Sequence, residues 1–159
     1  MIAANSLPYD WEDELVTLPG VPPGPRALVA ENDPRLRNQI VSLLAAEGLF
    51  VTEVMTSKEL LQAATSSVSR LTEPFNLIVA DLPMPDGGGI ETLDLVRKAG
   101  CQGPAIVITC SIDATGSAEL VRLHAEHLTK PFANESLRVL ASRVRTAYDA
   151  ARDLDACRH

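Results

Sequence analysis

The stretch NLIVADLPMPDGGGIE, residues 76–91, joins an apolar run to an abrupt break in the chain. Residues 77–80 are continuously apolar, which is typical of a strand that is buried on both faces of a parallel sheet. A single acid, Asp81, ends the run, and prolines and three consecutive glycines follow it, which favour turns. The acid therefore stands where a buried strand meets a loop, a position that calls for a chemical explanation.

The same alternation of strand and helix continues on both sides of this stretch. Asp33 is placed to cap a helix, Pro34 suits its first position and Gly48 suits its end. Five such pairs predict an α/β fold: a doubly wound, five-stranded parallel sheet with helices on both faces. The predicted strands are 26–30, 49–55, 75–80, 104–110 and 125–129, and the predicted helices are 33–48, 56–68, 89–100, 113–123 and a last one from 134 to near the end.

The length of 159 residues suits one folded core. Residues 1–25 hold four acids and no lysine or arginine, and they end in LPGVPPGP, so they are predicted to be an acidic, Pro/Gly-rich tail and linker. The folded domain is predicted at residues 26–148. Residues 149–159 are predicted to extend the last helix.

The composition excludes several classes of function. A formal charge of −7 disfavours direct binding to nucleic acid, whose phosphates need a basic face. No apolar run approaches the roughly 20 residues of a membrane helix, and the N-terminus lacks a signal-peptide pattern. The three cysteines have no metal-ligand spacing and are expected to be reduced, with Cys110 predicted to be a small packed side chain. A cytoplasmic protein without membrane contact is predicted.

Side chains with useful chemistry stand at the ends of four predicted strands. Because the carboxyl ends of parallel strands share one edge of the sheet, these side chains are expected to converge. Converging acids suit a divalent cation such as Mg²⁺, and an added lysine and hydroxyl suit a phosphoryl group with an aspartate as nucleophile. The residues are Glu31, Asn32 and Asp33 after the first strand, Asp81 after the third, Thr109 at the fourth and Lys130 after the fifth.

Four motifs in this order resemble the receiver domain of two-component response regulators, in particular the single-domain chemotaxis type. They are LVAENDP, DLPMPDGGG, VIT ending at Thr109, and TKPF with Lys130, and the similarity spans roughly residues 26–148. The resemblance implies a flavodoxin-like receiver fold. It also implies a phosphoprotein of a phosphorelay, which accepts a phosphoryl group and is not an ordinary enzyme, although it could dephosphorylate itself.

The resemblance also assigns roles to single residues. Asp81 would accept the phosphoryl group from a histidine kinase or a histidine phosphotransfer protein, with Mg²⁺ required. Lys130 and Thr109 would contact that group, and the Lys130–Pro131 peptide bond would be cis. The implied metal ligands are Glu31, Asn32, Asp81 and the backbone carbonyl of Pro83.

Two positions depart from the family's pattern. Asn32 stands where the family normally has the acid that ligates the metal, so weaker Mg²⁺ binding and slower phosphotransfer are predicted. His127 stands at the position of the family's switch aromatic. Either its imidazole rotates between two positions, or it is an ordinary residue of a surface strand.

The last helix indicates a second surface. Its apolar stripe continues beyond the length that a lone receiver needs, which suggests a homodimer or a helix that leads to an output domain. A downstream protein target is expected on the face of the fourth helix, the fifth strand and the last helix, where phosphorylation would bias a two-state surface. The stripe comprises Leu137, Leu140, Val144, Ala147, Ala151 and Leu154.

Two alternative functions remain open at this point. Asn32 is compatible with a degenerate receiver, an interaction module that does not need phosphorylation. A phosphatase of the haloacid-dehalogenase type also uses an aspartate after a strand, but it requires a second aspartate two residues on, where this chain has Pro83. Acetyl phosphate and Mg²⁺ would distinguish the three.

Overall fold

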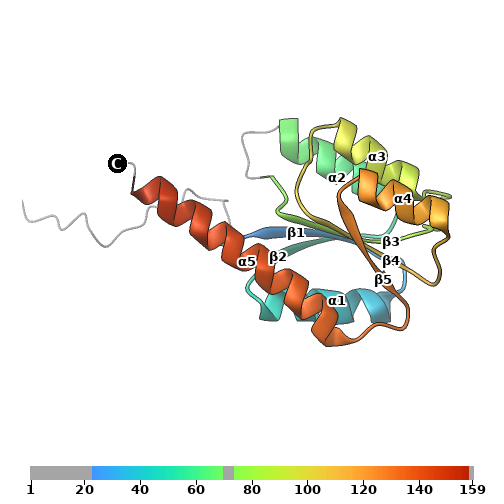
Figure 1. Ribbon diagram of the computed structural model, residues 1–159, viewed down its shortest axis with the longest axis horizontal. Coiled ribbons are helices and arrows are strands. Elements are labelled where there is room, and N and C mark those ends of the chain that lie inside the picture. The colour runs from blue at the N-terminus through green and yellow to red at the C-terminus, as the bar shows by residue number, and fades with distance from the viewer. Residues whose placement is uncertain (1–22, 70–73, 158–159) are drawn as a thin grey trace, which may run out of the picture.

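The computed structural model describes residues 23–69 and 74–157 and shows a parallel sheet between two layers of helices (Figure 1). The strand order is β2-β1-β3-β4-β5, and all neighbouring strands are parallel. The predicted five-stranded, doubly wound α/β fold is confirmed. The elements are β1 (Arg26–Ala30), α1 (Pro34–Ala46), β2 (Phe50–Val54), α2 (Ser57–Ser69), β3 (Leu77–Asp81), α3 (Ile90–Lys98), β4 (Ala105–Thr109), α4 (Ala114–Arg122), β5 (Ala125–Thr129) and α5 (Asn134–Ala156).

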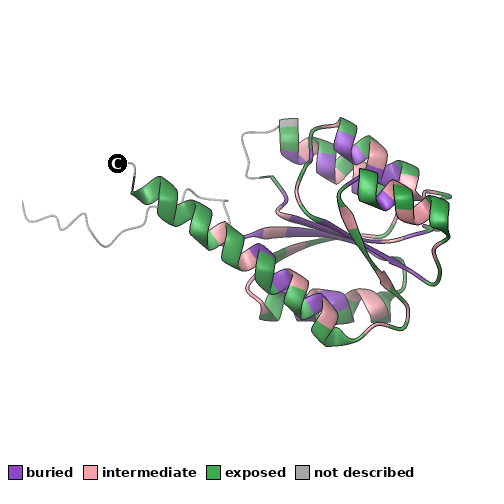
Figure 2. Cartoon of the chain, in the orientation of Figure 1, coloured by how far each residue is buried: buried purple, intermediate pink, exposed green. Residues whose placement is uncertain are grey.

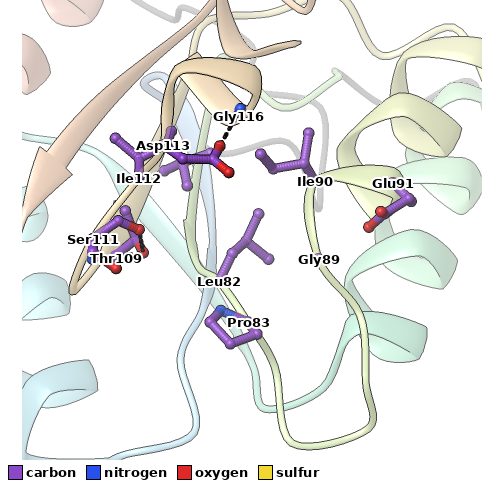
Figure 3. Close-up of a pocket in the computed structure, with 11 residues that line it drawn as sticks. Leu82, Pro83, Gly89, Ile90, Glu91, Thr109, Ser111, Ile112, Asp113 and Gly116 are labelled. Carbon is purple, nitrogen blue, oxygen red and sulfur yellow. Dashed lines mark hydrogen bonds between the residues drawn. The ribbon is translucent and has the colours of Figure 1, made fainter. Parts of the chain in front are cut away.

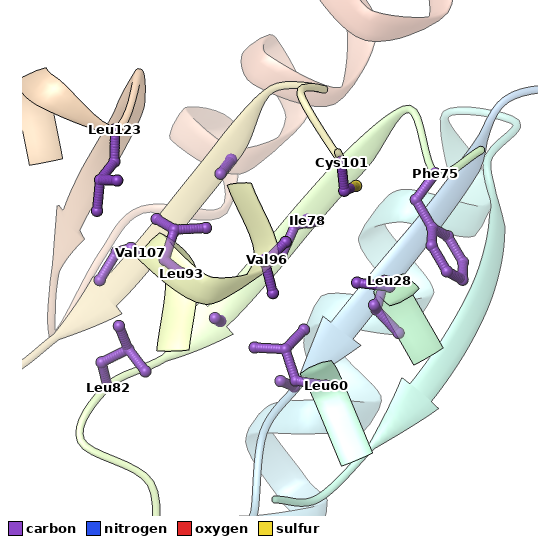
Figure 4. Packing of buried hydrophobic residues seen from close by; sticks show 14 of the residues in the cluster. Leu28, Leu60, Phe75, Ile78, Leu82, Leu93, Val96, Cys101, Val107 and Leu123 are labelled. Carbon is purple, nitrogen blue, oxygen red and sulfur yellow. The ribbon is translucent and has the colours of Figure 1, made fainter. Parts of the chain in front are cut away.

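Each face of the sheet has its own apolar core. Helices α1 and α5 cover one face, and α2, α3 and α4 cover the other (Figure 1). Side chains of β1 alternate between the faces: Leu28 packs toward α2 and α3, whereas Val29 packs toward α1 and α5. Figure 4 shows the first core, in which Leu60 and Val96 bring α2 and α3 onto the sheet. Because both faces are covered, the central strands are apolar throughout.

The first helix begins where the sequence predicts. Asp33 accepts a hydrogen bond from the backbone N–H of Arg35 at 2.8 Å, and Pro34 is the first helical residue. Gly48 follows the helix with a φ of +84°, a left-handed conformation that favours glycine. The Asp33 cap joins the start of α1 to the segment after β1, in which Glu31 lies.

The glycine-rich loop after β3 is held against the start of α2. Asp86 accepts hydrogen bonds from the backbone N–H groups of Ser57 and Lys58, both at 3.0 Å. These bonds lower the pKa of Asp86 below its usual value. A Cβ atom on Gly88 would lie 1.6 Å from Ser57 Oγ, so no larger residue fits there without movement. Asp86 was not singled out from the sequence, yet it fixes the loop that begins at Asp81.

A buried arginine ties two turns together at the amino edge of the sheet. Arg97 is 8% exposed and donates to the carbonyls of Leu123 (2.9 Å), Cys101 (2.8 Å) and Gly103 (2.6 Å). Burial lowers the pKa of Arg97. The turn before β5 is completed by His124, which has a φ of +52°. The end of α4 is therefore anchored to the turn between α3 and β4.

The last helix is packed in its first half only. Leu137, Ala141 and Val144 are buried against the sheet, whereas Ala151 and Leu154 are exposed. Figure 2 shows the C-terminal part of α5 projecting beyond the sheet with mostly exposed residues.

Some predictions fall outside the part of the chain that the structure describes. These are the tail up to residue 22 and the end of the C-terminal extension, residues 158–159. None of the described helices is long and apolar enough to cross a membrane.

Candidate functional site

Three strands deliver the central residues of the site to one edge of the sheet. Asp81 is the last residue of β3, Glu31 follows β1, and Lys130 follows β5. The ammonium nitrogen of Lys130 lies 2.5 Å from Oδ2 of Asp81 and 3.9 Å from Oε2 of Glu31. A cavity of about 420 Å³ opens here, lined by Glu31, Asn32, Asp33, Asp81, Pro83, Met84, Pro85 and Lys130.

Glu31 is the most deeply buried of these polar side chains, with 1% of its surface exposed. Its Oε1 accepts a hydrogen bond from the backbone N–H of Asp33 at 2.8 Å, whereas its Oε2 has no hydrogen-bond partner among the described residues. Burial, and after it the neighbouring Asp81 carboxylate, raise the pKa of Glu31 from 4.5 to about 7 against the opposing effects of the Asp33 N–H and of Lys130. A buried carboxylate oxygen that has no hydrogen bond and lies beside a second carboxylate fits a divalent cation.

Lys130 holds its charge in this setting. Partial burial lowers the pKa of Lys130, but its hydrogen bond to Asp81 and its attraction to Asp81 and Glu31 outweigh this effect, and the net shift is upward. The lysine is therefore a fixed positive charge beside Asp81. Both the Lys130–Pro131 and the Leu82–Pro83 peptide bonds are cis.

Asn32 and Asp33 complete the acidic edge in different ways. Asn32 is exposed and lines the cavity, and the side chain of Asp33 caps α1. In the described part of the chain, no three or more histidine, cysteine, aspartate or glutamate side chains gather in a way that could hold a metal ion. The cavity is lined by the carboxylates of Glu31 and Asp81 together with Asn32 and Pro83, which are oxygen-bearing groups of the kind that suit a hard divalent cation.

Thr109 lies at the same edge but belongs to a second cavity. Its hydroxyl donates to the carbonyl of Ser111 at 2.8 Å and accepts from the Ser111 N–H at 3.3 Å. Figure 3 shows the second cavity, of about 420 Å³, between the starts of α3 and α4, with the side chains of Leu82, Ile90 and Ile112 reaching into it. The structure therefore groups Glu31, Asn32, Asp81, Pro83 and Lys130, and places the Thr109 hydroxyl beside them but turned away.

Two further predictions concern single residues on β4 and β5. His127 lies on the edge strand β5 opposite Val107; it is exposed and lines neither of the two cavities. Cys110 is exposed, so the prediction of a packed side chain was wrong. The reason is its position: β4 ends at Thr109, and the chain beyond that residue has left the covered part of the sheet.

One supporting residue of the site was missed from the sequence. Arg37, on α1, donates to the backbone carbonyls of Glu31 and Asn32 and to the carboxylate of Glu53. Its spacing of four residues from the helix cap at Asp33 places it on the same side of the first turn as the cap. That spacing was the available signal, but the partners, which follow β1 or lie on β2, are outside any local pattern.

With this geometry in view, comparison with known proteins identifies the class. The family model of the response regulator receiver domain matches residues 27–142, so the chain belongs to that family. It is a receiver domain of the two-component response-regulator type.

Individual relatives agree with this assignment. The alkaline phosphatase synthesis transcriptional regulatory protein SphR of Synechococcus elongatus is 26% identical over 140 residues, which are 86% of this chain and 54% of SphR. Response regulator RR06 of Streptococcus pneumoniae is 31% identical over 119 residues, 74% of this chain and 50% of RR06. The chain thus spans about half the length of these curated relatives. A CheY-like receiver domain from Methanospirillum hungatei has the same fold, with a TM-score of 0.65 and 23% identity over 76% of this chain and 93% of that one.

Proposed function

We propose that this protein is a phosphoacceptor receiver in two-component signal transduction. Asp81 takes a phosphoryl group from a histidine kinase or a histidine phosphotransfer protein in the cytoplasm, and the modified domain changes a surface that binds a downstream protein. The observation that carries the proposal is the placement of Lys130 at 2.5 Å from Asp81, beside the unpartnered buried oxygen of Glu31. An interaction module without phosphorylation has no chemical need for this combination.

The proposed reaction balances as a simple phosphoryl transfer. A carboxylate oxygen of Asp81 attacks phosphorus, an O–P bond forms as the P–N bond of the phosphohistidine breaks, and the imidazole leaves with the bonding electron pair and takes up a proton. Lys130 stays beside Asp81 and neutralises an oxygen of the transferred group. The hydroxyl of Thr109 would exchange its bonds with Ser111 for one to the same group.

A metal ion completes the proposed site. Glu31, Asn32, Asp81 and the backbone carbonyl of Pro83 would hold Mg²⁺, and bound Mg²⁺ supplies positive charge to the phosphoryl oxygens. The unpartnered oxygen of Glu31 supports this assignment. Asn32 leaves one negative charge fewer than a carboxylate would, so this chain is expected to bind Mg²⁺ less tightly than a receiver with an aspartate there.

The proposed boundaries follow the sequence predictions. We infer a receiver domain over residues 26–148 and, beyond it, a continuation of α5 whose exposed stripe offers a surface for a second copy of the chain. The partner-binding face would comprise α4, β5 and α5, and His127 lies on this face. The second cavity, which lies beside Thr109 between the starts of α3 and α4, leaves space for α4 to move and so supports this assignment.

Incubation with acetyl phosphate and Mg²⁺, followed by intact mass spectrometry, tests the proposal. The wild-type chain is expected to gain one phosphoryl group, and Asp81→Asn to gain none. Asp149→Asn, an exposed aspartate on α5, serves as a control that keeps the modification. If the wild type is not labelled, the degenerate interaction module is favoured instead. Asn32 is the residue that is compatible with that alternative. Continuous release of phosphate, abolished by Asp81→Asn, would favour a phosphatase.

A further inference from the structure

Arg37 makes contacts that connect α1 to the loop carrying the proposed metal ligands. Its Nε lies 3.1 Å from the carboxylate of Glu53 on β2. Its Nη1 donates to the carbonyl of Glu31 at 3.1 Å and to the carbonyl of Asn32 at 3.5 Å. The Arg37 side chain is 17% exposed and that of Glu53 is 44% exposed, and the bond to the Glu31 carbonyl is partly buried.

The loop after β1 has few other supports at the point where Asn32 stands. Glu31 is anchored on both sides, through its N–H to the carbonyl of Val54 at 3.1 Å and through its carboxylate to the N–H of Asp33. Asn32 has an exposed side chain, and the guanidinium of Arg37 reaches the carbonyl of Asn32 from α1. Among the described residues, Arg37 is therefore the side chain that bonds the Asn32 backbone carbonyl.

We propose that Arg37 is a positioning residue for the cation site: it orients the Glu31 and Asn32 backbone so that their side-chain oxygens face Asp81. This inference rests on the proposed function and adds a residue to it. The guanidinium of Arg37 bonds one carboxylate and two carbonyls at once, whereas a lysine at position 37 would offer a single nitrogen. Glu53 neutralises the charge of Arg37 and fixes its direction.

The sign of the effect separates positioning from charge. A positive guanidinium near the acidic cavity repels a divalent cation, so if only charge mattered, its removal would strengthen Mg²⁺ binding. If Arg37 positions the loop, its removal weakens binding, because the ligands lose their arrangement before the cation arrives. The two explanations therefore predict opposite changes in the dissociation constant.

The test compares Arg37→Gln and Arg37→Lys with Arg35→Gln. Arg35 lies on the same helix, is exposed, and its side chain makes no polar contact in the described part of the chain. The dissociation constant for Mg²⁺ is measured by isothermal titration calorimetry. Both Arg37 variants are expected to bind Mg²⁺ roughly tenfold more weakly, the size of effect known for groups that orient metal ligands. Arg35→Gln is expected to match the wild type.

A second readout uses labelling by acetyl phosphate, and the calorimetry is the readout that does not depend on the proposed function. The Mg²⁺ concentration that gives half the maximal labelling by acetyl phosphate should rise in the Arg37 variants, while the rate at saturating Mg²⁺ stays close to that of the wild type. Arg37→Lys decides if Arg37→Gln does not fold, because it keeps the charge. Unchanged or tighter Mg²⁺ binding in Arg37→Lys would overturn the inference. If instead the wild type binds Mg²⁺ but is never labelled, the proposed function fails while the calorimetry still tests Arg37.

Discussion

Lys130 lies 2.5 Å from Asp81 although their strands, β5 and β3, are separated by β4. The lysine side chain passes the end of β4 at Thr109. The backbone carbonyl of Thr109 accepts a hydrogen bond from the Lys130 N–H at 2.8 Å, and the Thr109 hydroxyl donates to the carbonyl of Ser111. The pair therefore spans the ends of β3, β4 and β5.

Replacing Lys130 by methionine should separate metal binding from phosphoryl transfer. Without the ammonium, the Glu31 and Asp81 carboxylates attract Mg²⁺ more strongly, by about fivefold or ~1 kcal/mol for a charge at this distance in a partly wet site. Labelling by acetyl phosphate should slow roughly 100-fold, because a preorganised donor to the transferred group is lost. Calorimetry and intact mass spectrometry measure the two effects.

Lys98→Met is the matched control for this change. Lys98 is exposed on α3 and pairs with Asp94 at 2.6 Å, away from the cavity. It should alter neither measurement. Weaker Mg²⁺ binding in Lys130→Met would contradict the assignment of Lys130 as the charge opposing the cation.

Asn32→Asp restores the carboxylate that the family pattern contains. The added negative charge should tighten Mg²⁺ binding several-fold and speed labelling at low Mg²⁺ concentration, since cation affinity follows the number of charged ligands. Asn38→Asp adds the same charge at an exposed position of α1 and is expected to change little. Equal affinities for Asn32→Asp and the wild type would show that residue 32 is not a ligand.

Glu31 makes stability depend on pH when no metal is bound. Its pKa rises from an ordinary value of 4.5 to about 7 in the folded chain, so the folded state holds the proton more tightly than the unfolded state. This contribution to the free energy of unfolding is fully present below pH 4.5 and is lost as the pH rises through 7, by roughly 3 kcal/mol in all. Urea unfolding at pH 5 and pH 8 in the presence of a chelator measures it.

Glu31→Gln should remove most of that pH dependence, because the amide does not ionise. Glu135→Gln, at the exposed start of α5, should keep it. If the free energy of unfolding changes between pH 5 and pH 8 by the same amount in the wild type and in Glu31→Gln, Glu31 ionises freely in the folded chain and the prediction is wrong.

Arg97→Met should destabilise the fold without touching the site. Removing the guanidinium leaves buried carbonyls of Cys101, Gly103 and Leu123 without a donor, at a cost of about 3 kcal/mol. Urea unfolding should show this loss, while the Mg²⁺ affinity stays unchanged because Arg97 lies at the opposite edge of the sheet. Arg138→Met, an exposed residue of α5, should be neutral in both measurements. A large change in Mg²⁺ affinity in Arg97→Met would show that the two edges are coupled.

Local patterns in the sequence predicted most of the fold. The bounds of β1 and β5 agree with the predicted strands, and the Asp33 cap with Pro34 marks the start of α1. The third strand extends one residue further than its apolar run, because Asp81 still pairs with Ile108 in the backbone ladder. A ladder depends on backbone hydrogen bonds, so hydropathy alone could not reveal its last residue.

The sequence by itself determined the five strand-and-helix pairs and which residues stand at the strand ends, because periodicity, caps and turn residues act over a few neighbouring positions. Only the tertiary structure decided how those residues meet. It placed the Lys130 ammonium on Asp81, turned the Thr109 hydroxyl to Ser111, and joined Asp86 to the start of α2. These contacts link segments far apart in the chain, and their geometry depends on how whole helices pack on the sheet, which no local pattern encodes.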